Sequence, residues 1–139
     1  QLGIATDYVR SIDDTYTAQA MIMTDRDNNQ ITAFHPGAMA HAQVNTVSAR
    51  PDIRLGIISP DGREAMLLHA EQMHAAGIPF VFDPGQGLPM FDGAELAHLI
   101  DLATWVTVND YEGKMLEEKT GHSLEKIATR VQARCGTSL

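Results

Sequence analysis

Three side chains that carry oxygen atoms follow a short β-branched run in the segment WVTVNDYEGKML, residues 105–116. They are Asn109, Asp110 and Glu112, and a helical pattern begins directly after them. The start of a helix presents free backbone N–H groups and the positive end of its dipole, and both favour phosphate. A carboxylate there can also hold Mg²⁺, usually through the waters of the ion. These residues could therefore bind magnesium and phosphate groups.

The same spacing also has a purely structural explanation. Asn109 as the N-cap and Glu112 three residues later form a capping box, which is a common way to begin a helix. From the spacing alone the capping box is the commoner outcome, and a ligand site is the alternative. Asp83 poses a similar choice, because it precedes Pro84 and can simply end a strand.

The elements around these residues alternate between strand and helix. Asp52–Ser59 is a continuous apolar run, which predicts a strand buried on both faces. Further strands are expected in residues 78–83 and 104–109, and helices in residues 60–77, 93–103, 110–121 and from Ser123 onward. Parallel neighbours need a crossover helix, so three successive strand–helix units predict an α/β fold with a doubly wound, mostly parallel sheet.

In such sheets ligands gather outside the carboxyl ends of the strands. That rule selects three segments of this chain, residues 59–62, 83–87 and 109–112. We expect them to line one edge of the sheet, which places Asp83, Asn109 and Glu112 in the same neighbourhood.

An antiparallel element precedes this pattern. Thr17–Asp25 and Gln30–His35 are strand-like, and the turn-forming residues DRDNN join them. The two runs predict a β-hairpin that projects from the α/β part. We therefore divide the chain into residues 1–50, which hold the hairpin and its connections, and residues 51–139, which form part of an α/β core.

Composition excludes several classes of function. A formal charge of −8 argues against a nucleic-acid surface. No apolar run approaches the ~20 residues of a membrane span. Cys135 is the single cysteine, so no internal disulfide forms, and a reducing, cytoplasmic setting is expected. Dinucleotide, Walker A and zinc motifs are absent from the sequence. The chain opens without Met and stops directly after a helical pattern, so we expect a segment of a longer protein.

The order of these elements resembles the ribokinase-like (PfkB) family of sugar and nucleoside kinases. The segment TAQAMIMTDRDNNQITAFHPGAM is similar to the lid strands of that family, with Gly37-Ala38-Met39 where a GAN-like tripeptide is usual. FVFDPGQG resembles a strand that ends in Asp-Pro in many members, and VTVNDYEGKML resembles the N-x-x-E motif. The resemblance covers nearly the whole chain in order, which is more specific than any single motif.

The resemblance implies ATP-dependent phosphorylation of the hydroxymethyl group of a nucleoside or sugar, with adenosine preferred. Asn109 and Glu112 would then orient Mg²⁺ and the ATP phosphates, with water between Glu112 and the metal, and Asp83 is a weaker candidate at the same edge.

On the lid, the residues expected to face the substrate are Ala18, Ile31, Ala33 and His35. Strand alternation then places Thr32 and Phe34 on the other face. The alternative is a lid that packs against the core or against the lid of a second subunit, which would make a homodimer.

Two parts of the family pattern are missing from these 139 residues. The general base, an Asp in a DTxGAGD-like motif, is absent, and so is the substrate-gripping portion with its GG-type motif. The chain alone should therefore be inactive, whereas the full-length protein should be a kinase. The rival hypothesis is a non-catalytic α/β ligand-binding or regulatory domain in which Asn109 and Glu112 are ordinary caps.

Overall fold

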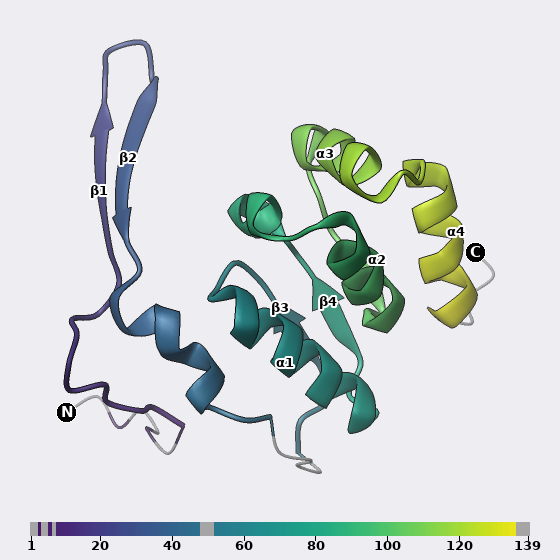
Figure 1. Cartoon of the computed structure of the whole chain (residues 1–139), viewed down its shortest axis with the longest axis horizontal. Helices are drawn as coiled ribbons and strands as arrows, with labels where there is room; N and C mark the ends of the chain where they lie inside the picture. The colour runs from purple at the N-terminus through teal and green to yellow at the C-terminus, as the bar shows by residue number, and fades with distance from the viewer. Residues whose placement is uncertain (1–2, 4–5, 7, 48–51, 136–139) are drawn as a thin grey trace.

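A computed structural model describes residues 3, 6, 8–47 and 52–135 of the chain (Figure 1). Its elements, in chain order, are β1 (Gln19–Thr24), β2 (Gln30–His35), the 3₁₀ helix η1 (Gly37–Val44), β3 (Gly56–Ile58), α1 (Arg63–Ala75), β4 (Phe80–Phe82), the 3₁₀ helix η2 (Gly85–Met90), α2 (Gly93–Leu102), β5 (Trp105–Val106), α3 (Asp110–Thr120) and α4 (Leu124–Cys135). The side chain of Cys135 lies outside the described part.

The three short strands β3, β4 and β5 form a parallel sheet in chain order, as predicted. Ile57 is level with Val81, and Val81 is level with Trp105. Helices α1 and α2 make the crossovers and lie together over one face of the sheet (Figure 1). The α/β fold with a parallel sheet and flanking helices is thus confirmed.

The core lies between this sheet and the helices. Phe80 and Phe82 of β4 are fully buried and pack with apolar side chains of the helices, among them Met66, Leu96, Leu99, Ile100 and Leu116. Burying each large apolar side chain contributes roughly 1.5–3 kcal/mol, so this cluster is the main stabilising feature of the α/β part.

The prediction for Asp52–Ser59 needs a correction. Only Gly56–Ile58 is a strand, and it is buried on one face, because Ile57 is 63% exposed while Ile58 is 4% exposed. Trp105, which lies on the same face as Ile57, is 44% exposed. Helices α1 and α2 pack on the opposite face, so the apolar run of β3 is not buried on both sides.

The predicted hairpin is present and stands apart from the α/β part (Figure 1). Strand β2 has the predicted bounds, and every residue of β1 and β2 is exposed. The turn is organised by Asp25, whose Oδ1 accepts hydrogen bonds from the backbone N–H groups of Asp27 (2.8 Å) and Asn29 (2.9 Å). Asn29 also donates its side-chain N–H to Asp25 Oδ2 at 2.9 Å, and this bond is the main reason that the pKa of Asp25 is lowered.

The root of the hairpin is tightly built. Gly37 is buried with φ of 50°, and a Cβ there would lie 2.1 Å from the carbonyl oxygen of Tyr16. The Ala38 N–H donates to that same oxygen at 2.8 Å. Two hydrogen bonds connect the segment after η1 to α1. His69 Nε2 lies 2.8 Å from Asn45 O, and the Val47 N–H donates to Gln72 Oε1 at 2.7 Å.

Within residues 3, 6, 8–47 and 52–135, none of the helices combines enough length with enough apolar character to cross a bilayer.

Candidate functional site

The carboxyl ends of the three parallel strands lie side by side, as expected. The Asp83 N–H donates to Ile58 O at 2.8 Å, and the Thr107 N–H donates to Phe82 O at 3.0 Å. Gly85 has φ of 45°, and a Cβ there would lie 2.7 Å from Pro60 Cγ. The segments that follow β3 and β4 therefore touch, and they form a common rim.

One hollow at this rim has a volume of about 400 Å³ and joins η2 to the start of α3. From α3 and its N-cap it is lined by Asn109, Tyr111, Glu112 and Met115, and from η2 by Gly85, Gln86, Leu88 and Pro89. We call it the NDYE hollow. The predicted pair Asn109 and Glu112 thus lies on the predicted rim.

The same two residues also form the capping box. Asn109 Oδ1 accepts from the Glu112 N–H at 2.9 Å, and Glu112 Oε2 accepts from the Asn109 N–H at 3.0 Å. Glu112 Oε1 accepts from Asn109 Nδ2 at 2.8 Å. The structural explanation is therefore confirmed, and it is compatible with a place on the wall of a hollow.

These contacts limit how Glu112 could serve a metal. Both of its oxygens already accept hydrogen bonds from Asn109, so a direct metal bond would displace one of them. Across the described ranges there is no group of three or more His, Cys, Asp or Glu side chains able to hold a metal ion. A single half-buried carboxylate fits a magnesium ion held through its waters, with phosphate oxygens as further ligands.

A second hollow of about 390 Å³ lies between the base of the hairpin and the same rim. Phe34 of β2 and Met39 of η1 line it on one side, and Pro60, Asp61, Gln86, Gly87 and Met90 line it on the other. We call it the hairpin-base hollow. Gln86 lines this hollow and the NDYE hollow, so the two are neighbours.

The expected substrate-facing residues of the lid do not line the hairpin-base hollow. The register places Ile31, Ala33 and His35 on one face of the hairpin, whereas Phe34 lies on the other. Ala18 precedes β1 and is half-buried. Phe34, which alternation places on the opposite face, is the strand residue that lines this hollow. Contact of the four expected residues with a substrate remains a prediction.

Asp83 directly follows β4 and is half-buried, but it lines neither of the two hollows. Its visible contribution is through the backbone, since its N–H extends the ladder between β3 and β4. A role for its carboxylate stays a prediction.

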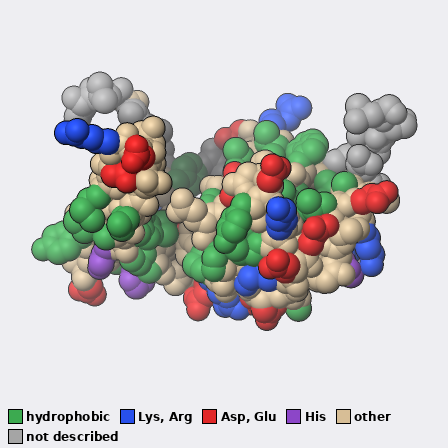
Figure 2. Space-filling model, turned by 90° about the horizontal axis from the view of Figure 1, so that it is seen from above, with side chains coloured by type: hydrophobic (Ala, Val, Ile, Leu, Met, Phe, Trp, Pro, Cys, Tyr) green, Lys and Arg blue, Asp and Glu red, His purple; other side chains and the backbone are tan. Residues whose placement is uncertain are grey.

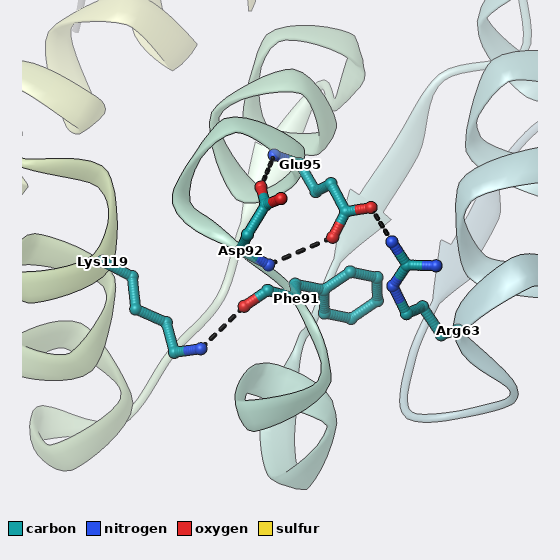
Figure 3. Close-up of polar contacts among 5 residues, drawn as sticks. All are labelled: Arg63, Phe91, Asp92, Glu95 and Lys119. Atoms are coloured by element: carbon teal, nitrogen blue, oxygen red, sulfur yellow. Dashed lines mark hydrogen bonds and ion pairs between the residues drawn. The ribbon is translucent and has the colours of Figure 1, made fainter.

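Polar contacts that the sequence did not reveal hold the rim in place (Figure 3). Lys119 Nζ donates to Phe91 O at 2.6 Å, which ties the end of η2 to α3. Arg63 at the start of α1 pairs with Glu95 at the start of α2, and Glu95 completes a capping box with Asp92. No local spacing relates Lys119 to Phe91 or Arg63 to Glu95, so only the fold could reveal these contacts.

The hairpin carries exposed apolar side chains (Figure 2). Met21, Met23 and Ile31 share one face and are 61%, 66% and 70% exposed. Ile22 and Phe34 on the other face are 56% and 54% exposed. A projecting hairpin with apolar side chains on both faces is suited to contacts with other surfaces.

Comparison with known proteins agrees with this geometry. The family model described as pfkB family carbohydrate kinase matches residues 1–137. A nucleoside kinase of Methanocaldococcus jannaschii is 30% identical over 118 residues, which cover 84% of this chain and 38% of that protein. The crystal structure of the nucleoside kinase of that organism, an archaeal member of the ribokinase family, has a TM-score of 0.75 at 26% identity and covers 85% of this chain and 39% of that one.

The nucleoside kinase of Burkholderia thailandensis is more similar still. Its structure in complex with inosine is 57% identical to this chain with a TM-score of 0.85, over 94% of this chain and 42% of that one. Its structure in complex with ADP-inosine has a TM-score of 0.83, over 94% and 41%. The chain spans about two fifths of the length of these relatives.

Proposed function

The chain belongs to the pfkB family of carbohydrate kinases, and from that premise we propose that the full-length protein transfers a phosphoryl group from ATP to the hydroxymethyl group of a nucleoside. The observation that carries the proposal is the pair of neighbouring hollows at one rim, one beside the hairpin and one beside Asn109 and Glu112. A transferase needs two adjacent ligand sites, whereas a regulatory binding domain needs only one.

The reaction is a simple displacement at phosphorus. The hydroxyl oxygen of the substrate forms a bond to the γ-phosphorus of ATP, while the bond from that phosphorus to the bridging oxygen breaks. ADP leaves with the electron pair, and the hydroxyl proton passes to a general base. The family resemblance assigns this base to a DTxGAGD-like motif, which these 139 residues do not contain.

On the nucleotide side we assign Asn109 and Glu112, which line the NDYE hollow, and Asp83, which follows the neighbouring strand β4. The start of α3 offers backbone N–H groups and the positive end of the helix dipole to phosphate oxygens. Glu112 would hold Mg²⁺ through water, as its occupied oxygens require. When bound with ATP, the ion would neutralise part of the negative charge of the phosphates.

The choice of nucleoside over sugar is supported by the relatives. The Burkholderia protein, which is 57% identical, binds inosine, and this favours a purine nucleoside. Adenosine remains our preferred substrate, with inosine as its nearest competitor. Phe34, which lines the hairpin-base hollow, supplies an aromatic ring that could stack on a base.

The decisive experiment is a coupled assay of ATP turnover by the full-length protein with adenosine, inosine, ribose and fructose in parallel. We expect turnover with the two nucleosides and much less with the two sugars. Sugar-stimulated turnover alone would remove the nucleoside proposal. No stimulation by any of the four would favour the non-catalytic binding or regulatory domain.

A conservative variant separates the metal role of Glu112 from its capping role. Gln can replace Glu in a capping box, so Glu112→Gln should leave folding intact. If the carboxylate holds hydrated Mg²⁺, the variant should need about tenfold more Mg²⁺ for its half-maximal rate. Glu118→Gln, at an exposed position of the same helix, is the control. A lower melting temperature with an unchanged Mg²⁺ requirement would mean that Glu112 is a cap only.

We further propose that the full-length protein forms a homodimer through the hairpin. The face with Met21, Met23 and Ile31 is apolar and exposed, and it lies opposite the face of Phe34. Because it also carries Ala33 and His35, packing against a second lid is the alternative to their contact with a substrate. Ile31→Glu should therefore shift the mass measured by light scattering from dimer to monomer. Ile22→Glu, on the Phe34 face, should not. A monomeric wild-type protein at micromolar concentration would contradict the proposal.

For the division of the chain we propose that residues 1–50 are the lid and its connections and that residues 51–139 are part of a larger α/β core. The support is the exposed apolar row on one face of the sheet, which includes Ile57 and Trp105. Exposed apolar rows of this kind are usually covered in complete α/β domains.

A further inference from the structure

Gln86 is the residue that the two hollows share. We propose that its side-chain carboxamide contacts both ligands of the reaction, the phosphoryl donor in the NDYE hollow and the acceptor nucleoside in the hairpin-base hollow. Gln86 would thereby hold the γ-phosphate and the attacking hydroxyl in line with each other. This inference rests on the proposed kinase function and deepens it, because it names a residue that positions both substrates at once.

The backbone around Gln86 is held firmly. Gly85 approaches Pro60 so closely that a Cβ would lie 2.7 Å from Pro60 Cγ, and the Gly87 N–H donates to Pro84 O at 2.8 Å. Leu88 is 1% exposed, which anchors η2 in the core. Gln86 itself is exposed, so a fixed loop presents a polar side chain to solvent at the boundary of the two hollows.

The far end of η2 is fixed as well. Lys119 Nζ donates to Phe91 O at 2.6 Å, directly after η2 (Figure 3). With both ends of the loop fixed, the carboxamide of Gln86 has only its own rotamers to order when ligands bind. A preorganised polar group of this kind is what in-line transfer needs.

The chemistry of the surrounding side chains singles out Gln86. Asn109 and Glu112 use their polar atoms on each other, and Asp61 Oδ1 accepts from the Gly62 N–H at 2.7 Å. No hydrogen bond from the described part of the chain engages the Gln86 carboxamide. Its NH₂ can donate to phosphate oxygens while its carbonyl oxygen accepts from a hydroxyl. Because it is neutral, it does not repel the phosphates as a carboxylate would.

The test uses the full-length enzyme with ATP and adenosine, each varied at saturation of the other. We expect Gln86→Ala to lower kcat about 10- to 100-fold with an unchanged melting temperature, because an in-line contact matters most in the transition state. Gln86→Glu should lower kcat further, since it places a negative charge beside the phosphates. Gln30→Ala, at the outer end of the hairpin, is the matched control and should behave as wild type.

The outcomes separate this inference from the proposed function. A wild-type enzyme without nucleoside-stimulated turnover would overturn both. An active wild type with Gln86→Ala within about twofold in kcat would overturn the inference alone. A variant that raises KM for only one substrate at unchanged kcat would also overturn it, because Gln86 would then touch one ligand and not both.

Discussion

The hairpin and the α/β part are stabilised by different kinds of interaction. Every residue of β1 and β2 is exposed, whereas β4 buries Phe80 and Phe82 completely. The hairpin is held by its ladder of backbone hydrogen bonds and by its turn, and the α/β part is held by a core. An isolated two-stranded hairpin is marginally stable in water. The comparison indicates that the free energy of folding comes mainly from the α/β core and that the hairpin depends on local contacts.

The largest effect should come from a core substitution, which tests whether stability is really so unevenly divided. Phe82→Ala removes a fully buried ring and should cost about 3–5 kcal/mol of unfolding free energy. Phe34→Ala, its counterpart in the hairpin, should cost less than about 0.5 kcal/mol, because Phe34 is 54% exposed. Urea unfolding of the full-length protein measures both, and equal losses would contradict the comparison.

An intermediate effect is expected at the root of the hairpin. Gly37→Ala places a Cβ 2.1 Å from Tyr16 O at a position with φ of 50°, so the hairpin root must shift. The cost of about 1–3 kcal/mol should fall on the hairpin, because local elements can open without the core. Hydrogen exchange should speed up in β1 and β2 and stay unchanged in α2.

Gly77→Ala is the control for that substitution. Gly77 has a similar φ of 67°, but a Cβ there meets nothing within 4 Å. It therefore carries the backbone cost without the collision. If both variants leave hydrogen exchange in β1 and β2 unaltered, the close contact between Gly37 and Tyr16 does not hold the hairpin in place.

The smallest effect should be a pH dependence confined to the hairpin turn. The side-chain amide of Asn29, together with the backbone N–H groups of Asn29 and Asp27, lowers the pKa of Asp25. The contribution of Asp25 is therefore complete above its unfolded pKa of about 3.9 and is lost as pH falls through the lower folded pKa. The side-chain NH₂ signals of Asn29, which bond directly to Asp25, should shift below about pH 4, and Asp25→Asn should abolish that shift.

The order of elements was predictable because it depends on local patterns. The turn residues between Thr24 and Gln30 specify the hairpin, and the spacing of Asn109 and Glu112 specifies the start of α3. The same patterns placed the strand ends at one rim, since parallel strands with crossover helices allow little else. The family resemblance added the kinase hypothesis, and the match to the pfkB family over residues 1–137 confirmed the family.

What could not be predicted depends on contacts between distant segments. Gln86 and Phe34 line one hollow although 52 positions of chain separate them, and no periodicity connects them. The burial of β3 on one face only also follows from where the described helices pack, since its composition is equally apolar at Ile57 and Ile58. Which face of the hairpin turns toward the rim also depends on distant contacts, because alternation gives two faces without distinguishing them.

The two contacts between the end of η1 and α1 have a mechanical consequence. Because Asn45 and Val47 are hydrogen-bonded to side chains of α1, the chain is fixed to the core directly after η1. Any movement of the hairpin relative to the α/β part must then be taken up between Pro36 and Asn45, a stretch that includes the kink at His41 in η1. A hinge confined to this stretch would make the movement a rigid-body rotation of the hairpin, with few backbone torsion angles available to adapt to a poorly fitting ligand.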